Sequence, residues 1–309
     1  MKSAAFLTCL LLLGGASCGD SAEAPEEQLV LEWHDEAQGV KSVEGRRDFG
    51  LEEGEWKWWH PNGQLARTGI FEHGRPIGTW HSWHPDGSDE SVEHFTTGEL
   101  HGLQERWYPN GQLELEIEYE QGLIQGAARH WSEDGILLRL EHAVAGQLEG
   151  EVVERWPNDQ LKVRGTFAGG KQVGASSSYF ENGQLQSTGR FEDGLQVGPW
   201  REYFEDGTLR FEADFAAGMP EGIARYYHEN GQVAAVAHFQ DGVQEGEFRT
   251  YFADGTPQTS GSYLAGKKHG TFVVHREDGS LDEEQSGEYE NGRRVARPDG
   301  TPIEGLPGR

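Results

Sequence analysis

Apolar and turn-forming residues recur along this chain at a constant spacing of 24 residues. An Asn-Gly or Asp-Gly pair recurs in nine units, with its glycine at Gly63, Gly87, Gly111, Gly135, Gly183, Gly207, Gly231, Gly255 and Gly279. Asn158-Asp159 stands at the one remaining position of the series. A ten-fold array at a fixed period is the sequence signature of a repeat protein.

Other residue types keep the same period. One glycine position recurs from Gly54 to Gly270 and another from Gly74 to Gly266. An aromatic position recurs at Trp59, Trp83, Trp107 and Trp131 and is tyrosine in later units, and Phe71 and Leu65 begin further aromatic and aliphatic series. Glycines fixed at repeat positions indicate backbone geometry, because a linker would scatter them.

Each unit predicts a β-hairpin, with strands over about 55–60 and 64–72 in the first clear unit. Pro or Glu before the Asn/Asp favours a type I turn closed by a left-handed glycine, although a two-residue type I′ turn is also compatible. This register sets Trp59 opposite Leu65 and predicts Gly69 and Phe71 on the same face. The Gly74-to-Gly78 segment is predicted to be the turn that connects successive hairpins.

The predicted fold is therefore all-β, an elongated open antiparallel β-meander of about ten stacked 24-residue β-hairpin repeats over residues 51–292. Residues 31–50 are expected to form a degenerate N-terminal capping unit. Residues 293–309 are expected to be a loosely ordered tail, with a docked end cap as the alternative. A chain that is 35% hydrophobic has no large central core, so hairpins must stabilise their neighbours.

The N-terminus predicts export. Residues 1–17 carry Lys2 and an apolar stretch too short to span a bilayer, which is typical of a signal peptide. Small residues before Cys18 resemble a bacterial lipobox, although Gly15 replaces the usual leucine. The resemblance implies lipidation of Cys18, an acidic flexible tether over 18–30 and an outer-membrane lipoprotein, with simple secretion as the alternative.

The net charge of −27 limits the partners. Such a chain repels nucleic acid and anionic headgroups. We therefore expect the protein to contact a membrane only through its lipid anchor. A basic protein, a divalent cation or a neutral glycan remains compatible. Solubility of a long exposed sheet and protection of its edges explain the same charge without a ligand.

No catalytic or cofactor motif is present. The sequence contains no His-Glu-x-x-His, paired cysteine, calcium loop, phosphate-binding loop or nucleophile elbow. His60, His84 and His228 share a repeat position with Tyr108 and Phe180, which indicates packing rather than metal binding. We therefore expect no enzyme, no metal and no cofactor.

The segment Trp59-His-Pro-Asn-Gly-Gln-Leu65, continuing to Gly69, Phe71 and Gly74, resembles the MORN repeat variant found in proteins labelled YwqK-like antitoxins. The resemblance covers residues 50–292. It implies a stack of antiparallel hairpins used for protein–protein contact. An exported chain fits the antitoxin label only if it neutralises a secreted or periplasmic toxin.

The tryptophans are the candidate binding residues. Trp56, Trp80 and Trp200 are expected to be exposed contacts, because Gln104, Ala128 and Ser176 occupy the same position in other units; Trp59, Trp83, Trp107 and Trp131 form the second candidate row. Alternatively, the aromatic rows only cover neighbouring hairpins. The preferred function is an anchored protein-binding scaffold, with a toxin-neutralising protein and a cell-wall glycan binder as alternatives.

Overall fold

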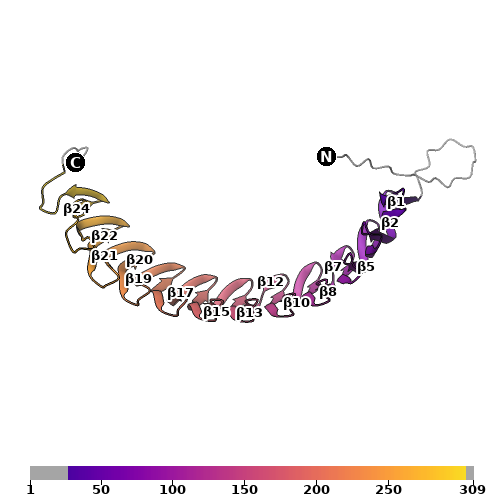
Figure 1. The fold of residues 1–309 in the computed structure, drawn as a ribbon, viewed down its shortest axis with the longest axis horizontal. Helices are drawn as coiled ribbons and strands as arrows, with labels where there is room; N and C mark the ends of the chain where they lie inside the picture. The colour runs from indigo at the N-terminus through magenta and orange to yellow at the C-terminus, as the bar shows by residue number, and fades with distance from the viewer. Residues whose placement is uncertain (1–26, 304–309) are drawn as a thin grey trace, which may run out of the picture. The chain divides into compact units, whose positions relative to one another are not determined.

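The computed structural model describes residues 27–303. Within that range the regular secondary structure consists of β-strands, with no helix. The signal segment and Cys18 lie outside the described residues. The chain divides into two compact units, unit 1 up to Gly150 and unit 2 from Glu151. In each unit the strands form an open antiparallel meander in which a strand pairs with its sequence neighbours (Figure 1). The predicted all-β hairpin array is confirmed.

Unit 1 contains strands of two to nine residues, namely β1 (Gln28–Asp35), β2 (Val40–Asp48), β3 (Leu51–Trp59), β4 (Leu65–Glu72), β5 (Arg75–Trp83), β6 (Asp89–Thr96), β7 (Glu99–Leu100), β8 (Gly102–Trp107), β9 (Leu113–Glu120), β10 (Leu123–Trp131), β11 (Leu137–Val144) and β12 (Gln147–Leu148). β13 (Gly150–Arg155) begins at the boundary. Unit 2 continues with β14 (Leu161–Ala168), β15 (Lys171–Tyr179), β16 (Leu185–Glu192), β17 (Leu195–Tyr203), β18 (Leu209–Ala216), β19 (Met219–Tyr227), β20 (Val233–Gln240), β21 (Val243–Tyr251), β22 (Pro257–Leu264), β23 (Lys267–Val274), β24 (Gly287–Glu290) and β25 (Arg293–Ala296).

The Asn/Asp-Gly turn has the geometry that the sequence favours. Gly63 donates from its backbone N–H to His60 O at 2.9 Å, and His60 donates to Gln64 O at 2.8 Å. Gly63 has φ +84°, whereas Asn62 keeps a negative φ. This is a type I turn closed by a left-handed glycine, and Asp159 (φ +68°) takes the glycine's place in the exceptional unit.

The second turn differs from the prediction. A two-residue loop, His73–Gly74, joins β4 to β5, and both residues have positive φ, 51° and 76°. This is the type I′ pattern, whose twist matches that of the flanking strands. The Gly74-to-Gly78 segment is therefore not the turn, because Arg75 already pairs with Glu72 as the first residue of β5.

Gly78 instead forms a bulge inside β5. Thr68 faces His81 and Ile70 faces Ile77, so three residues of β5 oppose Gly69 alone. Gly78 has φ +67°, a conformation that costs little only for glycine. The bulge brings the indole of Trp80 over the Cα of Gly69: an ideal Cβ on Gly69 would lie 2.0 Å from Trp80 Cδ2.

A second bulge corrects the predicted face. Trp59 pairs with Leu65 as expected, but Trp58 pairs with Arg67, so Ala66 is the extra residue. Gly69 and Phe71 therefore share a face with Trp56 and Trp58 and not with Trp59. The assumption of strict alternation from Leu65 onward was wrong because a bulge shifts the side-chain phase.

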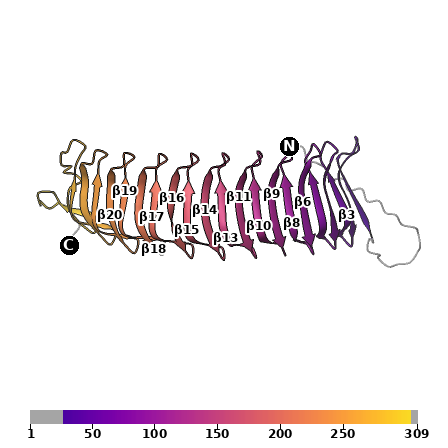
Figure 2. The same ribbon diagram turned by 90° about the horizontal axis from the view of Figure 1, so that it is seen from below.

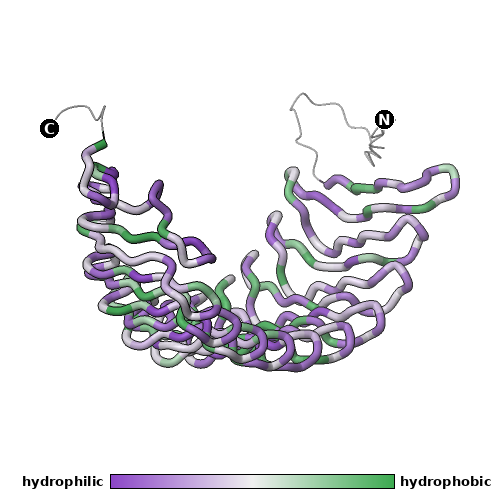
Figure 3. The backbone as a smooth tube through the Cα atoms, turned by 60° about the vertical axis from the view of Figure 1, so that its left-hand side comes forward, coloured by the Kyte–Doolittle hydropathy of each residue, from purple (hydrophilic) through white to green (hydrophobic). Residues whose placement is uncertain are grey.

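Apolar and polar residues alternate along the strands of each unit, without a segregated centre (Figure 3). Strands lie side by side with turns at both edges (Figure 2). The buried side chains form short clusters on one face, such as Leu115, Ile117 and Ala128 with Tyr119 and Ile124 against them. Stability therefore comes from contacts between adjacent strands.

The two ends of the described chain are strands as well. β1 and β2 pair with each other and occupy the predicted capping unit, although β1 starts at Gln28, inside the predicted tether. β25 pairs with β24, and Ala296 bridges to Pro302. Residues 293–296, at the start of the predicted tail, thus form a strand.

Candidate binding surface

One face of unit 1 carries a continuous group of aromatic rings, which we call the aromatic face: Trp56, Trp58, Phe71, Trp80 and Phe95. Centroids of Phe71 and Trp80 lie 4.9 Å apart with the planes at 89°, and Trp58 and Trp80 lie 5.6 Å apart. Trp80 also meets the ring of Phe95 at 5.8 Å. Edge-to-face pairs of this kind add stability beyond the area they bury.

Two rings of this face, and two rings at the same repeat position in unit 2, each lie over a glycine of the preceding strand. Trp56 covers Gly45, Trp80 covers Gly69, Trp200 covers Gly189 and Phe272 covers Gly261; an ideal Cβ on those glycines would approach ring atoms to 2.1, 2.0, 1.9 and 2.5 Å. No real Cβ tolerates such approaches. The glycine is thus required by the ring that covers it.

Other units fill the same space with different pairs. Ala128 pairs with Ile117. Here the small residue stands at the position of Trp80, and the large one at the position of Gly69. Gln104 donates a hydrogen bond to Glu93 Oε1 at 3.2 Å. Over Gly165, Gln172 takes the space of the ring and donates to Ser176 Oγ at 2.9 Å. The substitutions at this position are compensated by their partner, which is why the position varies.

The expectation that Trp56, Trp80 and Trp200 are exposed was wrong. Their exposed fractions are 4%, 4% and 8%. Variation across units at this position reflects paired packing and does not indicate exposure. The residue that the sequence analysis passed over is Trp58, which lies two residues after Trp56 on the same face and is half-buried. The spacing of two is the signal that could have found it.

The second candidate row is half-buried; it consists of Trp59, Trp83, Trp107 and Trp131. The position of Trp83 in β5 indicates that this row lies on the face opposite to the aromatic face. The ring of Trp83 stacks on His81, with centroids 5.9 Å apart and planes at 16°. His81 and Trp83 alternate with Trp80 and Ser82 along β5. The two predicted tryptophan rows are therefore not brought together.

The backbone of this second row links neighbouring hairpins. The carbonyl of Trp83 accepts a hydrogen bond from His60 Nε2 at 2.7 Å, and the carbonyl of Trp107 accepts one from His84 Nε2 at 2.8 Å. The hydroxyl of Tyr108 donates to Trp131 O at 3.0 Å. The histidines at this position thus join consecutive units, in addition to packing.

The Asn/Asp turns are linked in a second way. Asn62 donates from Nδ2 to Pro85 O of the next turn at 2.5 Å. Asp86 has no amide to donate, and its carboxylate accepts from the hydroxyl and backbone N–H of Ser88 in its own turn. The side-chain hydrogen bond from Ser88 lowers the pKa of Asp86, and Thr208 does the same to Asp206. These carboxylates are occupied by their own turns.

A groove of about 490 Å³ opens on the aromatic face, lined by Trp58, Arg67, Phe71, Pro76, Trp80 and Phe95. The guanidinium of Arg67 lies 4.8 Å from the centroid of Trp80 and forms an ion pair with Glu93 at 2.6 Å. The groove is therefore apolar and aromatic, with one side bordered by a paired charge.

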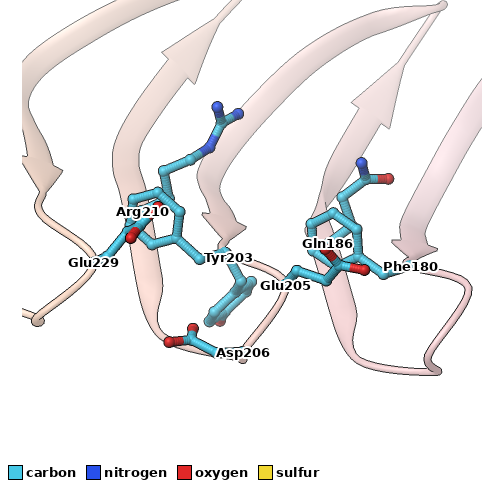
Figure 4. A pocket seen from close by; sticks show the side chains of 8 residues that line it. Phe180, Gln186, Tyr203, Glu205, Asp206, Arg210 and Glu229 are labelled. Carbon is cyan, nitrogen blue, oxygen red and sulfur yellow. The ribbon is translucent and has the colours of Figure 1, made fainter.

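A second groove lies near the Asn/Asp turns of unit 2 (Figure 4). Tyr203 lies between Asp206 and the guanidinium of Arg210, which point to different ends of the view. Arg210 pairs with Glu202, and Asp206 accepts from the hydroxyl of Thr208 at 2.6 Å. Because Arg210 and Asp206 already have partners, neither is free to recognise a ligand in this groove.

Within residues 27–303, no group of three or more histidine, cysteine or acidic side chains could hold a metal ion together. Over the same range, no helix has the length and apolar character needed to cross a membrane.

The hairpins with these turns, bulges and covered glycines were compared with known proteins. A family model described as "MORN repeat variant" matches residues 52–73, 100–121, 172–193, 196–217 and 220–241. Five of the units are matched by the MORN repeat variant. Each matched segment starts a few residues after a type I′ loop and ends at the first residue of the next one. No curated protein sequence matches the chain significantly.

Solved structures give no further guide. The chain is similar at 11–12% identity to three crystal structures, titled TcdB2-TccC3-TEV, TcdB2-TccC3-Cdc42 and TcdB2-TccC3 without the hypervariable C-terminal region. The matches cover 82%, 90% and 84% of this chain and 16%, 20% and 16% of those chains. The chain thus spans a fifth or less of their length, and TM-scores of 0.15, 0.14 and 0.15 support no conclusion.

Proposed function

We propose that this protein is an exported, lipid-anchored scaffold that binds another protein through the aromatic face of unit 1. Five units matched by the MORN repeat variant support a repeat scaffold as the general role. The observation that carries the proposal is the groove lined by Trp58, Phe71 and Phe95. Tryptophan-rich, well-packed surfaces are where binding energy concentrates in protein interfaces.

Two features favour unit 1 over unit 2 as the binding unit. Eight of the ten tryptophans precede Gly150, whereas Trp156 and Trp200 follow it. The aromatic groove also lies entirely within unit 1. The net charge of −27 favours a partner with a basic rim around an apolar centre.

The test is site-specific photo-crosslinking in cells of the native host. A photoreactive phenylalanine at position 58 is expected to give a defined adduct, whereas the same group at position 83, on the opposite face, is expected to give none. Equal adducts from both positions, or none from position 58 in a correctly exported protein, would contradict the proposed face.

Export and anchoring are tested separately. Cys18→Ser is expected to abolish incorporation of labelled fatty acid and to release the mature chain from the envelope fraction. Retention of the label in this variant would exclude Cys18 as the lipid attachment site, without affecting the crosslinking result.

A wall glycan is the second candidate for the same groove, because the face of an aromatic ring also packs against sugar. The aromatic lining of Trp58 and Trp80 favours it. Co-sedimentation with purified peptidoglycan separates the two candidates. Pelleting of wild-type protein that Trp58→Ala abolishes would support the glycan, and no pelleting would remove it.

A further inference from the structure

The type I′ edge of unit 2 carries three exposed apolar side chains, which we call the loop row: Leu195, Met219 and Val243. Each residue directly follows the glycine of a two-residue loop, so the three hold the same position in consecutive units. Their exposed fractions are 48%, 45% and 45%. Other large apolar side chains are as exposed, Leu51 and Leu123 among them, so what distinguishes the loop row is that its three members occupy one position in consecutive units.

The loop row is continuous across units. An ideal Cβ on Gly218 would lie 3.3 Å from Leu195 Cδ2, and one on Gly242 would lie 3.1 Å from Met219 Cγ. An ideal Cβ on Gly266 would lie 3.5 Å from Val243 Cγ1. Each side chain therefore lies against the next loop, and the glycines leave no side chain between successive members of the row.

The fold itself does not require apolar residues here. The same repeat position holds Arg75, Glu99, Gln147, Lys171 and Lys267 in other units, and all of them begin strands with the same register. Leu51 and Leu123 also occupy this repeat position, but the next unit after each of them has a charged or polar residue there. Only unit 2 has three consecutive apolar residues, so an external contact explains them better than folding does.

Carboxylates border the loop row. Glu221 accepts a hydrogen bond from the backbone N–H of Asp241 at 2.8 Å, and Glu245 accepts one from Ala265 at 2.7 Å, which holds both carboxylates beside the loops. Asp193 and Asp241 are themselves the first residues of their loops. An apolar row with acidic borders is complementary to an apolar stripe with basic borders.

The spacing selects an α-helix as the occupant. Equivalent residues of consecutive hairpins are two strands apart, about 9.6 Å. Residues seven apart on an α-helix are separated by about 10.5 Å along the axis. A helix laid across the loops can therefore place one apolar residue per heptad against each member of the row.

We propose that the loop row binds an amphipathic helix of a partner protein, with apolar residues at heptad spacing and lysine or arginine along both borders. This surface is separate from the aromatic face and does not depend on the function proposed for it.

The test uses the mature chain and a designed helical peptide of about three heptads, with leucines on one face and lysines beside them, titrated by calorimetry at 150 mM salt. The triple variant Leu195→Gln/Met219→Gln/Val243→Gln copies the natural Gln147 and is expected to weaken binding at least tenfold. The matched control, Leu51→Gln/Leu123→Gln, changes the same repeat position in unit 1 and is expected to bind as the wild type does.

Several outcomes would overturn the proposal. Equal binding by the wild type and the triple variant would mean that the cationic peptide binds only through net charge, and absence of binding would exclude a helix of this kind. Sedimentation that reveals a dimer lost in the triple variant would assign the row to a second copy. Vesicle binding lost in that variant would assign it to lipid. Unchanged thermal melting of the triple variant is the control for folding.

Discussion

At the scale of single residues, stability depends on pairs whose sizes complement each other across neighbouring strands. Trp80 over Gly69 and Ala128 beside Ile117 solve the same packing problem in opposite ways. Neither member can be judged alone, because glycine is required only where the partner is a ring. The pair is therefore the unit on which substitutions act.

Gly69→Ala and Trp80→Ala are expected to be strongly coupled. Gly69→Ala should cost about 1–3 kcal/mol or more, since its Cβ would overlap the indole. Trp80→Ala should cost about 3–5 kcal/mol through the cavity that it leaves. In the Trp80→Ala background the alanine at 69 should cost far less, a coupling of about 0.5–3 kcal/mol. Urea unfolding of the four proteins measures the cycle, and additive costs would contradict the pairing.

His130 gives unit 1 a pH dependence. Burial lowers its pKa below the usual 6.5, outweighing the opposing effect of Glu141. As the pH falls below 6.5, the unfolded chain takes up the proton first, so the folded state loses stability until its own lower pKa is passed. His130→Gln should show a smaller drop in urea midpoint between pH 7.5 and 5.5 than the wild type. Parallel profiles for the two proteins would exclude this role.

At the scale of elements, each hairpin is fixed by two turns with different requirements. The Asn/Asp turn needs one left-handed residue, Gly63 or its equivalent. The type I′ loop needs two, and many units place a residue with a Cβ at the first, as Ala145 (φ +49°) does. These loops store strain that the sheet on either side overcomes.

Ala145→Asn should stabilise unit 1 by about 1 kcal/mol, because asparagine is favoured at the first position of a type I′ turn. The reverse change, Asn291→Ala, alters an equivalent loop (φ +51°) and should destabilise unit 2. Thermal melting of both variants tests the pair. Destabilisation by Ala145→Asn would show that some other contact of the loop dominates.

At the scale of the whole molecule, the strands pair locally along the chain, with β6 pairing to both β7 and β8, so the fold is additive within each unit. Nothing in this arrangement fixes the number of repeats. Removal of whole repeats should therefore be tolerated, whereas a change of phase should not.

Deletion of residues 206–229 removes 24 residues and joins Glu205 to Asn230, which replaces Asp206 at the same turn position. It keeps Trp200 over Gly189 and should give a folded, cooperatively melting protein. Deletion of 206–228 removes 23 residues and reverses the faces of one strand, and it should unfold or aggregate. Circular dichroism and thermal melting of the two deletion variants test this prediction. If both variants fold equally well, the strand register does not control folding.

The period, the β-hairpin and the left-handed glycine of the Asn/Asp turn could be predicted from the sequence, because these depend on local backbone preferences that a few residues express. Which rings share a face, and which are buried, depends on contacts between strands. Bulges at Ala66 and Gly78 shift the side-chain phase, and Trp80 is buried by rings from neighbouring strands. Packing across strands is not a local property, so the periodic pattern alone could not predict that Trp56, Trp80 and Trp200 are covered.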